Sequence, residues 1–294
     1  MLIARLIAEN SDWETRVDAA KEELAAARMP VVQVLRHELG VPVLEFQFAV
    51  ADPEPVNLII DAHFGSVDRL ITNDMVELPK LFVSDMDSTM IEQECIDELA
   101  DFAGLKDRIS EITERAMLGE LDFETALLER VGLLKDLDEG AIQQCLTERI
   151  TPTPGARTLT QTLKAHGVRT VLVTGGFHHF ADEVAKWLGF DRVVGNRLGV
   201  ASGRLTGLLD GPISDANTKL ATLREEAAKL GEGAQVLASG DGANDIPMLE
   251  AASYGFAYRA KPKAREHANG RIDQGDLTAA LSLLGIPKEG WVED

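Results

Sequence analysis

Cysteine is scarce: the 294 residues include only two, Cys95 and Cys145. Two cysteines do not make a disulfide framework in a chain of this size, which argues against a secreted protein. The N-terminal segment MLIARLIAENSDW also lacks the basic region, apolar stretch and small-residue cleavage site of a secretory signal. No apolar run approaches the roughly 18 residues at which a membrane span becomes plausible. We therefore expect a cytoplasmic protein.

Positive charge is scarce as well, since 29 Lys and Arg residues face 49 Asp and Glu residues and the formal net charge is −20. The long-range field repels nucleic acid and anionic membranes, so we expect neither as a partner. A small phosphorylated substrate is also an anion. Any positive charge that binds it must therefore come from a few placed Arg or Lys side chains.

Residues 1–78 follow a pattern that predicts a small separate domain. We expect strands at 2–8, 31–37 and 42–50, helices at 12–27 and 53–64, and an apolar segment at 65–76. The order strand, helix, strand, strand, helix, strand is the split ferredoxin-like pattern, a sheet with helices on one face. No residue in this domain singles out a ligand.

From Pro79 onward the sequence predicts an α/β domain that continues to residue 294. Apolar strands are expected at KLFVSD, RTVLVTGG and AQVLASGDG, with helices near 155–166, 177–188 and 217–230. This alternation is typical of a parallel sheet covered on both faces, which binds its ligands beyond the carboxyl ends of the strands.

Two segments interrupt the alternation. Residues 95–150 lack a strand pattern and read as successive helices, which predicts a helical cap inserted after the first core strand. Residues 196–210 predict a hairpin that turns at Ser202 and Gly203.

The segment DMDST directly follows the first core strand. Asp85 and Asp87 would lie on the same side of an extended backbone, with Met86 pointing away. Two carboxylates at the end of a strand can share one metal ion and one phosphate group. Asp and Ser are also common after strands because they cap the next helix, so this motif alone leaves both interpretations open.

Two further polar segments offer phosphate ligands. VTGGF ends a strand with Thr174, Gly175 and Gly176, whose hydroxyl and unhindered backbone NH groups can face a phosphate. Such glycine turns also occur for steric reasons alone. In DANTK, Lys219 opens a helix and can reach a phosphate oxygen, whereas most single lysines are solvated surface groups.

The segment GDGANDIPM supplies Asp241, Asn244 and Asp245 within five residues. Hard oxygen ligands at this density suit Mg²⁺, which binds a few carboxylates and keeps water or substrate oxygens in its other positions. A calcium-type loop is the competing interpretation, but the chain has no repeated oxygen-ligand loop that ends in Glu.

DxDST, TGG, a lysine and GDGxND, in this order, form the complete four-motif series of the haloacid dehalogenase-like phosphatases, which the chain resembles from residue 80 to about 286. Within that superfamily, DMDSTMIEQECIDELA, ERVGLLKDL, ITPTPGA, VTGGF and GDGANDIPM resemble segments of the phosphoserine phosphatase family. That family implies a Rossmann-like core with a helical cap. The N-terminal domain resembles the amino-acid-binding ACT domains of bacterial members.

The resemblance implies a phospho-aspartyl mechanism. Asp85 would be the nucleophile and Asp87 the general acid and base. Mg²⁺ would be held by Asp85, the backbone carbonyl of Asp87 and Asp241, with Asp245 orienting its waters. The groups implied to neutralise the phosphate or to support that network are Thr174, Gly175, Gly176, Lys219 and Asn244. The family usually has serine where this chain has Thr174, which is a mild departure.

The resemblance also implies how the cap selects a substrate. Glu94 matches the residue that meets the substrate ammonium, and Arg130 matches the one that binds its carboxylate. Met117 and Phe123 would form an apolar wall. Without the resemblance, Glu94 and Arg130 would be ordinary solvated charges. Together they imply the small zwitterionic substrate O-phosphoserine, in the last step of serine biosynthesis.

Two alternatives stay open. One is a related phosphatase or phosphotransferase that acts on another small phosphomonoester, for example with homoserine as acceptor. The other is a regulatory amino-acid-binding protein with an inert core, although an inert core has no need to keep Asp85, Asp87, Lys219 and Asp241. The sequence also leaves open whether the protein is a homodimer and whether an amino-acid effector such as serine binds the N-terminal domain.

Overall fold

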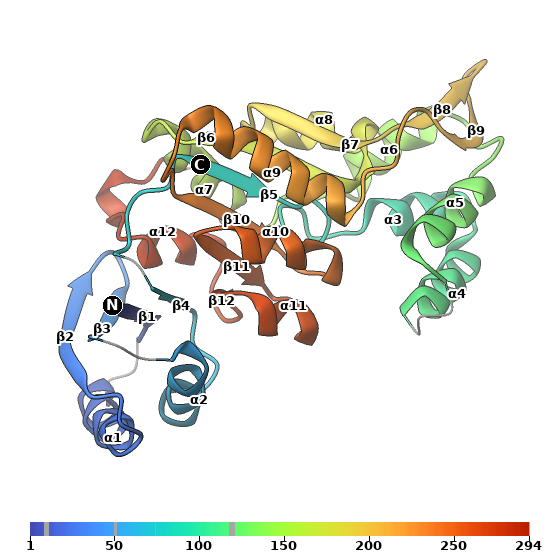
Figure 1. Ribbon diagram of the computed structural model, residues 1–294. Helices are drawn as coiled ribbons and strands as arrows, with labels where there is room; N and C mark the ends of the chain where they lie inside the picture. The colour runs from blue at the N-terminus through green and yellow to red at the C-terminus, as the bar shows by residue number, and fades with distance from the viewer. Residues whose placement is uncertain (9–11, 50–51, 74, 118–120, 294) are drawn as a thin grey trace.

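The computed structural model describes residues 1–8, 12–49, 52–73, 75–117 and 121–293. An N-terminal unit, a central sheet with helices on both faces, and a group of helices beyond one end of that sheet follow one another across the molecule (Figure 1). No described helix is both long and apolar enough to cross a membrane.

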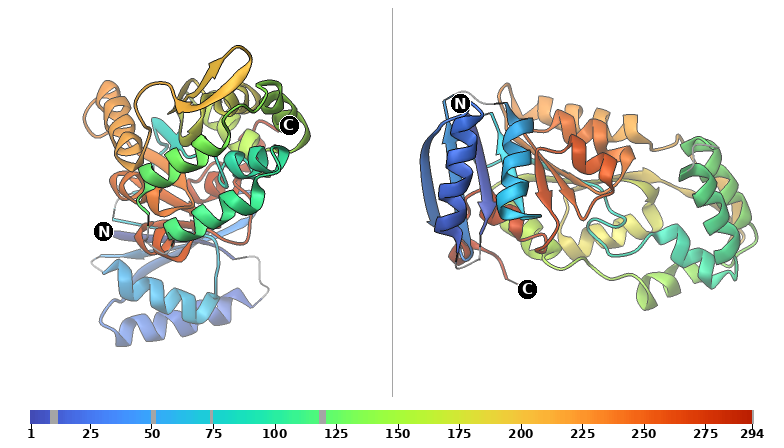
Figure 2. Two further views of the ribbon diagram at one scale, coloured as in Figure 1. Left: turned by 90° about the vertical axis from the view of Figure 1, so that its right-hand side faces the viewer. Right: turned by 90° about the horizontal axis from the view of Figure 1, so that it is seen from below.

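The described part of the N-terminal unit contains four strands and two helices in the predicted order. They are β1 (Leu2–Ile7), α1 (Trp13–Ala26), β2 (Val31–Glu38), β3 (Pro42–Phe48), α2 (Pro53–Phe64) and β4 (Arg69–Thr72). The strands are antiparallel and lie in the order β2-β3-β1-β4. Both helices cover one face of this sheet (Figure 2) and bury a common apolar cluster with β1 and β3. The predicted order of elements is therefore confirmed.

The central sheet is parallel, as predicted. Its strands are β5 (Leu81–Ser84), β6 (Arg169–Phe177), β7 (Arg192–Asn196), β10 (Val236–Gly240), β11 (Tyr254–Tyr258) and β12 (Gly270–Ile272). They lie in the order β12-β11-β10-β5-β6-β7, and each neighbouring pair is parallel. The sequence patterns did not predict β7, β11 and β12.

Helices cover both faces of this sheet, because successive residues of its strands point to opposite sides. The helices are α7 (Ala156–Ala165), α8 (His178–Leu188), α9 (Ala216–Leu230), α10 (Ile246–Ala251), α11 (Pro262–His267) and α12 (Ala279–Leu283), and short 3-10 turns span Ala243–Asp245 and Lys288–Gly290. Phe82 of β5 packs in the apolar cluster that α7 and α8 share. Leu81 and Val83 pack with α9 and α10 on the other face.

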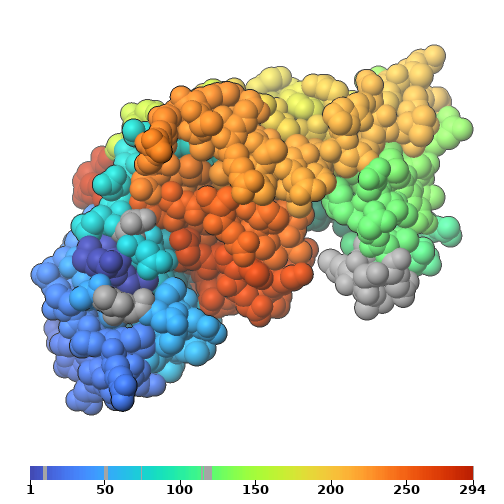
Figure 3. All heavy atoms as spheres, in the orientation of Figure 1, coloured from blue at the N-terminus to red at the C-terminus, as the bar shows by residue number. Residues whose placement is uncertain are grey.

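In the part of the cap that the structure describes, four helices are inserted between β5 and α7, as predicted for this segment. They are α3 (Cys95–Phe102), α4 (Lys106–Met117), α5 (Phe123–Leu133) and α6 (Gly140–Glu148). The cap lies beyond the carboxyl end of β5, and a hollow separates its visible surface from the core helices drawn in red (Figure 3).

The predicted hairpin is formed by β8 (Leu198–Ala201) and β9 (Arg204–Leu209). Its turn residues Ser202 and Gly203 have φ values of 54° and 75°, as a tight hairpin turn requires. The hairpin is also hydrogen-bonded to the cap. The NH of Asp136 donates to the carbonyl of Leu205 at 2.9 Å, and the NH of Leu205 donates to the carbonyl of Leu137 at 2.9 Å. A core segment thus holds one end of the cap.

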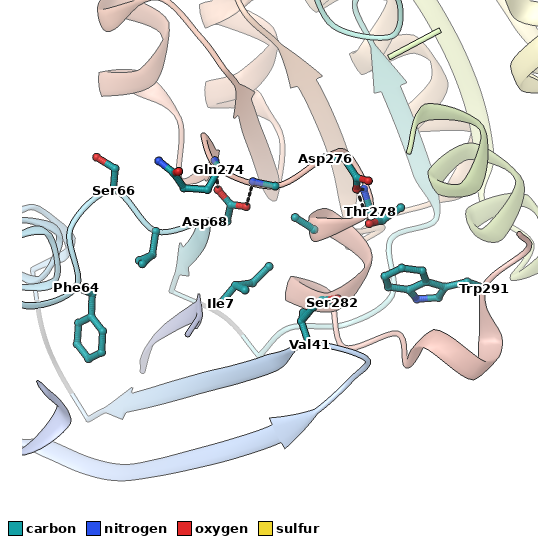
Figure 4. Close-up of a pocket in the computed structure, with 13 residues that line it drawn as sticks. Ile7, Val41, Phe64, Ser66, Asp68, Gln274, Asp276, Thr278, Ser282 and Trp291 are labelled. Atoms are coloured by element: carbon teal, nitrogen blue, oxygen red, sulfur yellow. Dashed lines mark hydrogen bonds between the residues drawn. The ribbon is translucent and has the colours of Figure 1, made fainter. Parts of the chain in front are cut away.

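The N-terminal and central sheets join into one ten-stranded sheet through antiparallel pairing of β4 with β12. Asp68 reinforces the junction, because its carboxylate accepts from the backbone NH groups of residues 273, 274 and 275 at 2.7 to 2.9 Å. A cavity of about 620 Å³ lies beside it, bordered by residues of both units such as Ile7, Ser282 and Trp291 (Figure 4). The sequence did not predict this continuity.

Candidate active site

The polar segments after β5 and β10 meet because these strands are parallel neighbours and end at the same edge of the sheet. Carboxylate oxygens of Asp85, Asp241 and Asp245 lie within 4.8 Å of one another, and all three residues are buried. Nζ of Lys219, from the first turn of α9, lies 2.7 Å from Oδ1 of Asp85 and 2.7 Å from Oδ1 of Asp245. The predicted motifs therefore form one cluster.

Carboxylates outnumber ammonium groups in this cluster, and the pKa values reflect that excess. Burial and the charge of Asp245 raise the pKa of Asp85 well above its ordinary value. The same two causes raise the pKa of Asp241 to about 6. Burial alone would lower the pKa of Lys219, but Asp245 and Asp85 raise it, so this lysine stays charged. The cluster as a whole attracts a further cation.

Both carboxylate oxygens of Asp245 accept hydrogen bonds. Its Oδ2 accepts from the backbone NH groups of Asp241 at 3.2 Å and Gly242 at 3.0 Å, while Oδ1 faces Lys219. A Cβ on Gly240 would lie 2.4 Å from Cγ of Asp245, so glycine is needed there. Asn244 is half-buried on the same turn, and its Oδ1 lies beside Gly242.

Asp87 lies beyond the end of β5, between the core and the cap. Its Oδ1 accepts from the backbone NH of Cys95 at 2.9 Å, and its Oδ2 accepts from Oγ1 of Thr174 at 3.3 Å. Burial, followed by the negative charge of Glu94, raises the pKa of Asp87 to about 7. A carboxyl group that is half protonated near neutral pH can both donate and accept a proton.

The turn that ends β6 is closely packed against Asp87. The NH of Gly176 donates to Oγ1 of Thr174 at 2.8 Å. A Cβ on Gly176 would lie 2.6 Å from Oδ2 of Asp87, so a larger residue would displace that carboxylate. A Cβ on Gly175 would lie 3.2 Å from Cζ of Phe123, which places the ring of this cap residue over the turn.

Two residues that the sequence did not single out hold the β6 turn. Nδ2 of Asn196 donates to the carbonyl of Gly175 at 2.7 Å, and its Oδ1 accepts from the NH of Ser214 at 2.8 Å. Oγ of Ser214 donates to the carbonyl of Thr174 at 2.8 Å. Both side chains are buried. The signal in the sequence that could have indicated Asn196 is its position as a polar residue at the end of β7.

The predicted cap residues lie in or next to α3, α4 and α5. Glu94 immediately precedes α3, is exposed and accepts from Oγ of Ser88 at 2.7 Å. Arg130 of α5 is half-buried, and the charges of Asp97, Glu94 and Asp87 act on its guanidinium group. Met117 ends α4, but its side chain lies outside the described part of the chain. The cap therefore contributes charges of both signs that act on Asp87 or on its surroundings.

The donor set suits a hard divalent cation. Asp85 and Asp241 keep carboxylate oxygens for an ion, whereas both oxygens of Asp245 already have partners, namely Lys219 and two backbone NH groups. Nζ of Lys261 is 4.0 Å from Oδ2 of Asp241 and adds only a solvent-exposed charge. Three buried carboxylates beside one buried ammonium leave negative charge that a cation can offset.

Comparison with known families gives the class of this site. A family model described as haloacid dehalogenase-like hydrolase matches residues 82–250. The matched residues include the whole cap and the cluster of Asp85, Lys219, Asp241 and Asp245. The chain belongs to the haloacid dehalogenase-like hydrolases. Its α/β core with a mostly parallel sheet is the core expected for this family.

Curated relatives of this haloacid dehalogenase-like hydrolase at 41 to 44% identity are phosphoserine phosphatases. That of Archaeoglobus fulgidus is 44% identical over 211 residues, which cover 71% of this chain and 61% of the relative. The chain spans 61 to 65% of the length of the first three curated relatives that it matches.

Two solved structures resemble this haloacid dehalogenase-like hydrolase over nearly its full length. A HAD family hydrolase from Salmonella enterica serovar Typhi matches with a TM-score of 0.84 and 27% identity, over 97% of this chain and 99% of that one. A probable phosphoserine phosphatase from Vibrio cholerae matches with a TM-score of 0.74 and 30% identity, over 98% and 87%. The N-terminal unit is thus shared with solved relatives.

Proposed function

We propose that the chain hydrolyses O-phospho-L-serine to serine and phosphate through an aspartyl-phosphate intermediate, as the last step of serine biosynthesis in the cytoplasm. The observation that carries the proposal is that Asp85 pairs with a buried lysine, while the nearby Asp87 interacts electrostatically with two opposite charges of the cap, Glu94 and Arg130. The phosphoserine phosphatases among the relatives support the choice of substrate.

In the first step, a carboxylate oxygen of Asp85 attacks phosphorus while the bond from phosphorus to the serine oxygen breaks. Asp87 gives its proton to that oxygen, and its pKa of about 7 suits this transfer. Lys219, Thr174 and the NH groups of the β6 turn neutralise the phosphate oxygens, which is the main catalytic task in phosphoryl transfer.

In the second step, water attacks phosphorus and the bond between phosphorus and Asp85 breaks. Asp87, now ionised, takes a proton from the water, and inorganic phosphate leaves. The Asn196 and Ser214 hydrogen bonds keep the β6 turn in place through both steps. One water molecule is consumed in each cycle.

The same proposal includes Mg²⁺ as the cofactor. Asp85, Asp241 and the backbone carbonyl of Asp87 would hold it, with Asp245 orienting its waters and Asn244 supporting the network. The hydrogen bonds that occupy both oxygens of Asp245 suit that indirect role. When bound, the ion supplies positive charge that neutralises and orients the phosphate.

The cap would select the amino-acid part of the substrate. Glu94 faces the ammonium group, Arg130 binds the carboxylate, and Phe123 with Met117 forms the apolar wall. The ring of Phe123 over Gly175 supports this arrangement because it closes the site above the phosphate-binding turn.

For the chain organisation, we propose a ferredoxin-like, ACT-like domain at 1–78 and a phosphatase domain at 79–294, and a homodimer. An amino-acid effector at the N-terminal domain would use the cavity shared with the core. Asp68 and Asp276 line that cavity, whereas none of the described residues that line it is basic, so it suits an ammonium group better than a carboxylate. Calorimetric titration with serine and analytical ultracentrifugation test these two points.

Phosphate release from phosphoserine, phosphothreonine and para-nitrophenyl phosphate, with and without Mg²⁺, tests the proposed activity. We expect strong preference for phosphoserine, no turnover by Asp85→Asn, and a loss confined mainly to phosphoserine in Arg130→Ala. Equal turnover of all three substrates by the wild type would rule out the substrate. Activity in Asp85→Asn would rule out the mechanism, and homoserine compared with serine as phosphate acceptor identifies a transferase.

A further inference from the structure

Ser88 has a backbone conformation that is unusual for a residue with a side chain. Its φ is 53°, in the left-handed region that residues other than glycine seldom adopt, and it directly follows the proposed general acid Asp87. Such a conformation costs free energy and persists where the surrounding structure fixes it, most often at functional sites. The proposed mechanism does not use the Ser88 side chain.

Three hydrogen bonds close the chain between Asp87 and Cys95 into a loop. The NH of Ser88 donates to the carbonyl of Gln93 at 3.2 Å, and the NH of Cys95 donates to Oδ1 of Asp87 at 2.9 Å. Oγ of Ser88 donates to Oε1 of Glu94 at 2.7 Å. The loop therefore returns Glu94 to the residue that follows the proposed general acid.

The hydrogen bond from Ser88 leaves part of the Glu94 carboxylate available. Within the described part of the chain, Oε1 of Glu94 has Ser88 as its hydrogen-bond partner and Oε2 has none. An ionised carboxylate accepts at both oxygens, so Oε2 can accept from an ammonium group while Oε1 stays bonded. Glu94 is exposed, whereas Ser88 is half-buried and held by the loop. The Ser88 hydroxyl therefore restricts a side chain that would otherwise move among several rotamers.

We propose that Ser88 is a positioning residue whose hydroxyl holds the Glu94 carboxylate in the orientation that receives the substrate ammonium. This inference rests on the proposed function and deepens it. An acidic side chain that is oriented before the substrate arrives loses less conformational entropy on binding, so the ammonium is bound more tightly. The same role accounts for the left-handed backbone, because the tight turn at Ser88 brings Glu94 within reach of its Oγ.

The proposal separates two substrates by one group. Phosphoserine carries an ammonium, whereas para-nitrophenyl phosphate carries none. Because Ser88 acts only through Glu94, loss of its hydroxyl should weaken the binding of phosphoserine and spare para-nitrophenyl phosphate. The value of kcat for phosphoserine should be kept, whereas a general disturbance of the loop would displace Asp87 and lower kcat.

Two variants of Ser88 distinguish the hydroxyl from the backbone. Ser88→Gly and Ser88→Ala both remove the hydroxyl, but only glycine relieves the strain of a positive φ. We expect both to raise KM for phosphoserine about fivefold, the size of one net hydrogen bond, with kcat changed less than about twofold. Kinetics with para-nitrophenyl phosphate should match the wild type. If Ser88→Ala does not fold on its strained backbone, Ser88→Gly alone carries the comparison.

Ser202→Gly is the matched control. Ser202 also has a positive φ, 54°, but it is exposed at the turn of the β8–β9 hairpin. The same substitution in the same backbone conformation should leave the kinetics with both substrates unchanged.

A double-variant cycle tests whether Ser88 acts through Glu94. In a Glu94→Ala background, Ser88→Gly should cause no further rise in KM for phosphoserine, because the carboxylate that it orients is gone. A second, independent role of Ser88 would instead add its own loss to that of Glu94→Ala.

Any of four results would overturn the inference. They are an unchanged KM for phosphoserine in Ser88→Gly, a rise confined to Ser88→Ala, equal losses with para-nitrophenyl phosphate, and losses that add in the Glu94→Ala background. Failure of the proposed function gives a different result, because the wild type would then show no preference for phosphoserine. If the wild type prefers phosphoserine and Ser88→Gly behaves like Ser202→Gly, only the role of Ser88 is wrong.

Discussion

Lys219 and Asp85 form a buried ion pair in which Nζ lies 2.7 Å from Oδ1, with 0% and 7% of the two side chains exposed. Lys219→Met would leave Asp85 and Asp245 without their buried counter-charge, which typically costs about 3 to 5 kcal/mol. We expect the variant to lose that much unfolding free energy in urea at neutral pH, and to lose roughly 10²-fold or more in phosphate release.

Lys229→Met is the matched control for this prediction. Lys229 lies on the same helix, but its side chain is 55% exposed, and its two partners Glu225 and Glu226 both keep Arg192 as a second counter-charge. Its loss should cost less than about 1 kcal/mol. Equal stability of the two variants would contradict a charge-compensating role for Lys219.

The contact between Gly176 and Asp87 predicts a second effect. Gly176→Ala places a Cβ 2.6 Å from Oδ2 of Asp87, so the carboxylate must move. Displacement of a catalytic group by about 1 Å typically costs about 10²-fold in rate, and we expect that loss in kcat.

Gly132→Ala is the control, because a Cβ there meets no atom of the described residues within 4 Å and the residue is helical. It should keep wild-type kinetics and gain about 0.5 to 1 kcal/mol of stability. If Gly176→Ala turns over phosphoserine like Gly132→Ala, Asp87 is not held as the structure indicates.

A third prediction concerns pH. Asp87 must be protonated to assist the leaving oxygen, so kcat/KM should fall as pH rises through its pKa of about 7. Glu94 raises that pKa, and Glu94→Gln should therefore move the alkaline limb to lower pH. The limb is measured with β-glycerophosphate, an alkyl phosphate without an ammonium group, so that substrate binding by Glu94 does not contribute.

Bound metal lowers the pKa in both proteins alike, so the difference between them is the decisive quantity. Glu98→Gln, on α3 beside Arg149, serves as the control and should leave the limb unchanged. An identical limb in Glu94→Gln and the wild type would show that Glu94 does not act on the general acid.

A fourth prediction concerns stability rather than catalysis. Burial favours protonation of Glu226, but hydrogen bonds from Lys229, Arg192 and Arg169 lower its pKa to about 2. Because the folded pKa lies below the ordinary value of 4.5, the stabilisation is complete above pH 4.5 and disappears as pH falls toward 2.

At pH 7, Glu226→Gln should therefore have a free energy of unfolding about 1 kcal/mol lower than the wild type. The value is this small because the partners of Glu226 are partly exposed, and the difference should vanish near pH 2. Urea titrations across that range measure it. Glu225→Gln removes a neighbouring exposed acid and should have a smaller effect. A difference between Glu226→Gln and the wild type that persists unchanged at pH 2 would exclude the ionic origin.

The carboxylate cluster was predictable because parallel neighbouring strands end at one edge, so DMDST and GDGAND had to meet. Lys219 was different. Its sequence context resembles that of any surface lysine, and only the order of the motifs suggested its role. Lys219 lies in the first turn of α9 and is completely buried. That burial depends on how α9 packs against the core and not on the local sequence pattern.

Other residues could not be found in this way. Asn196 precedes the β8–β9 hairpin and Ser214 follows it. Both reach the β6 turn because the fold returns the chain to this turn after the hairpin. β12 is three residues long, too short for a recognisable alternation, so its pairing with β4 left no signal in the sequence. Met117 stays a prediction because its side chain is outside the described residues.

That pairing has a consequence for the architecture. Separate domains joined by a linker can be cut apart, but here β12 shares its backbone hydrogen bonds with β4 on one side and β11 on the other. Removing residues 1–78 would turn β12 into an uncovered edge strand, a template for pairing with other chains and for aggregation. The N-terminal unit is therefore also a protective cover for the catalytic sheet, whatever else it binds.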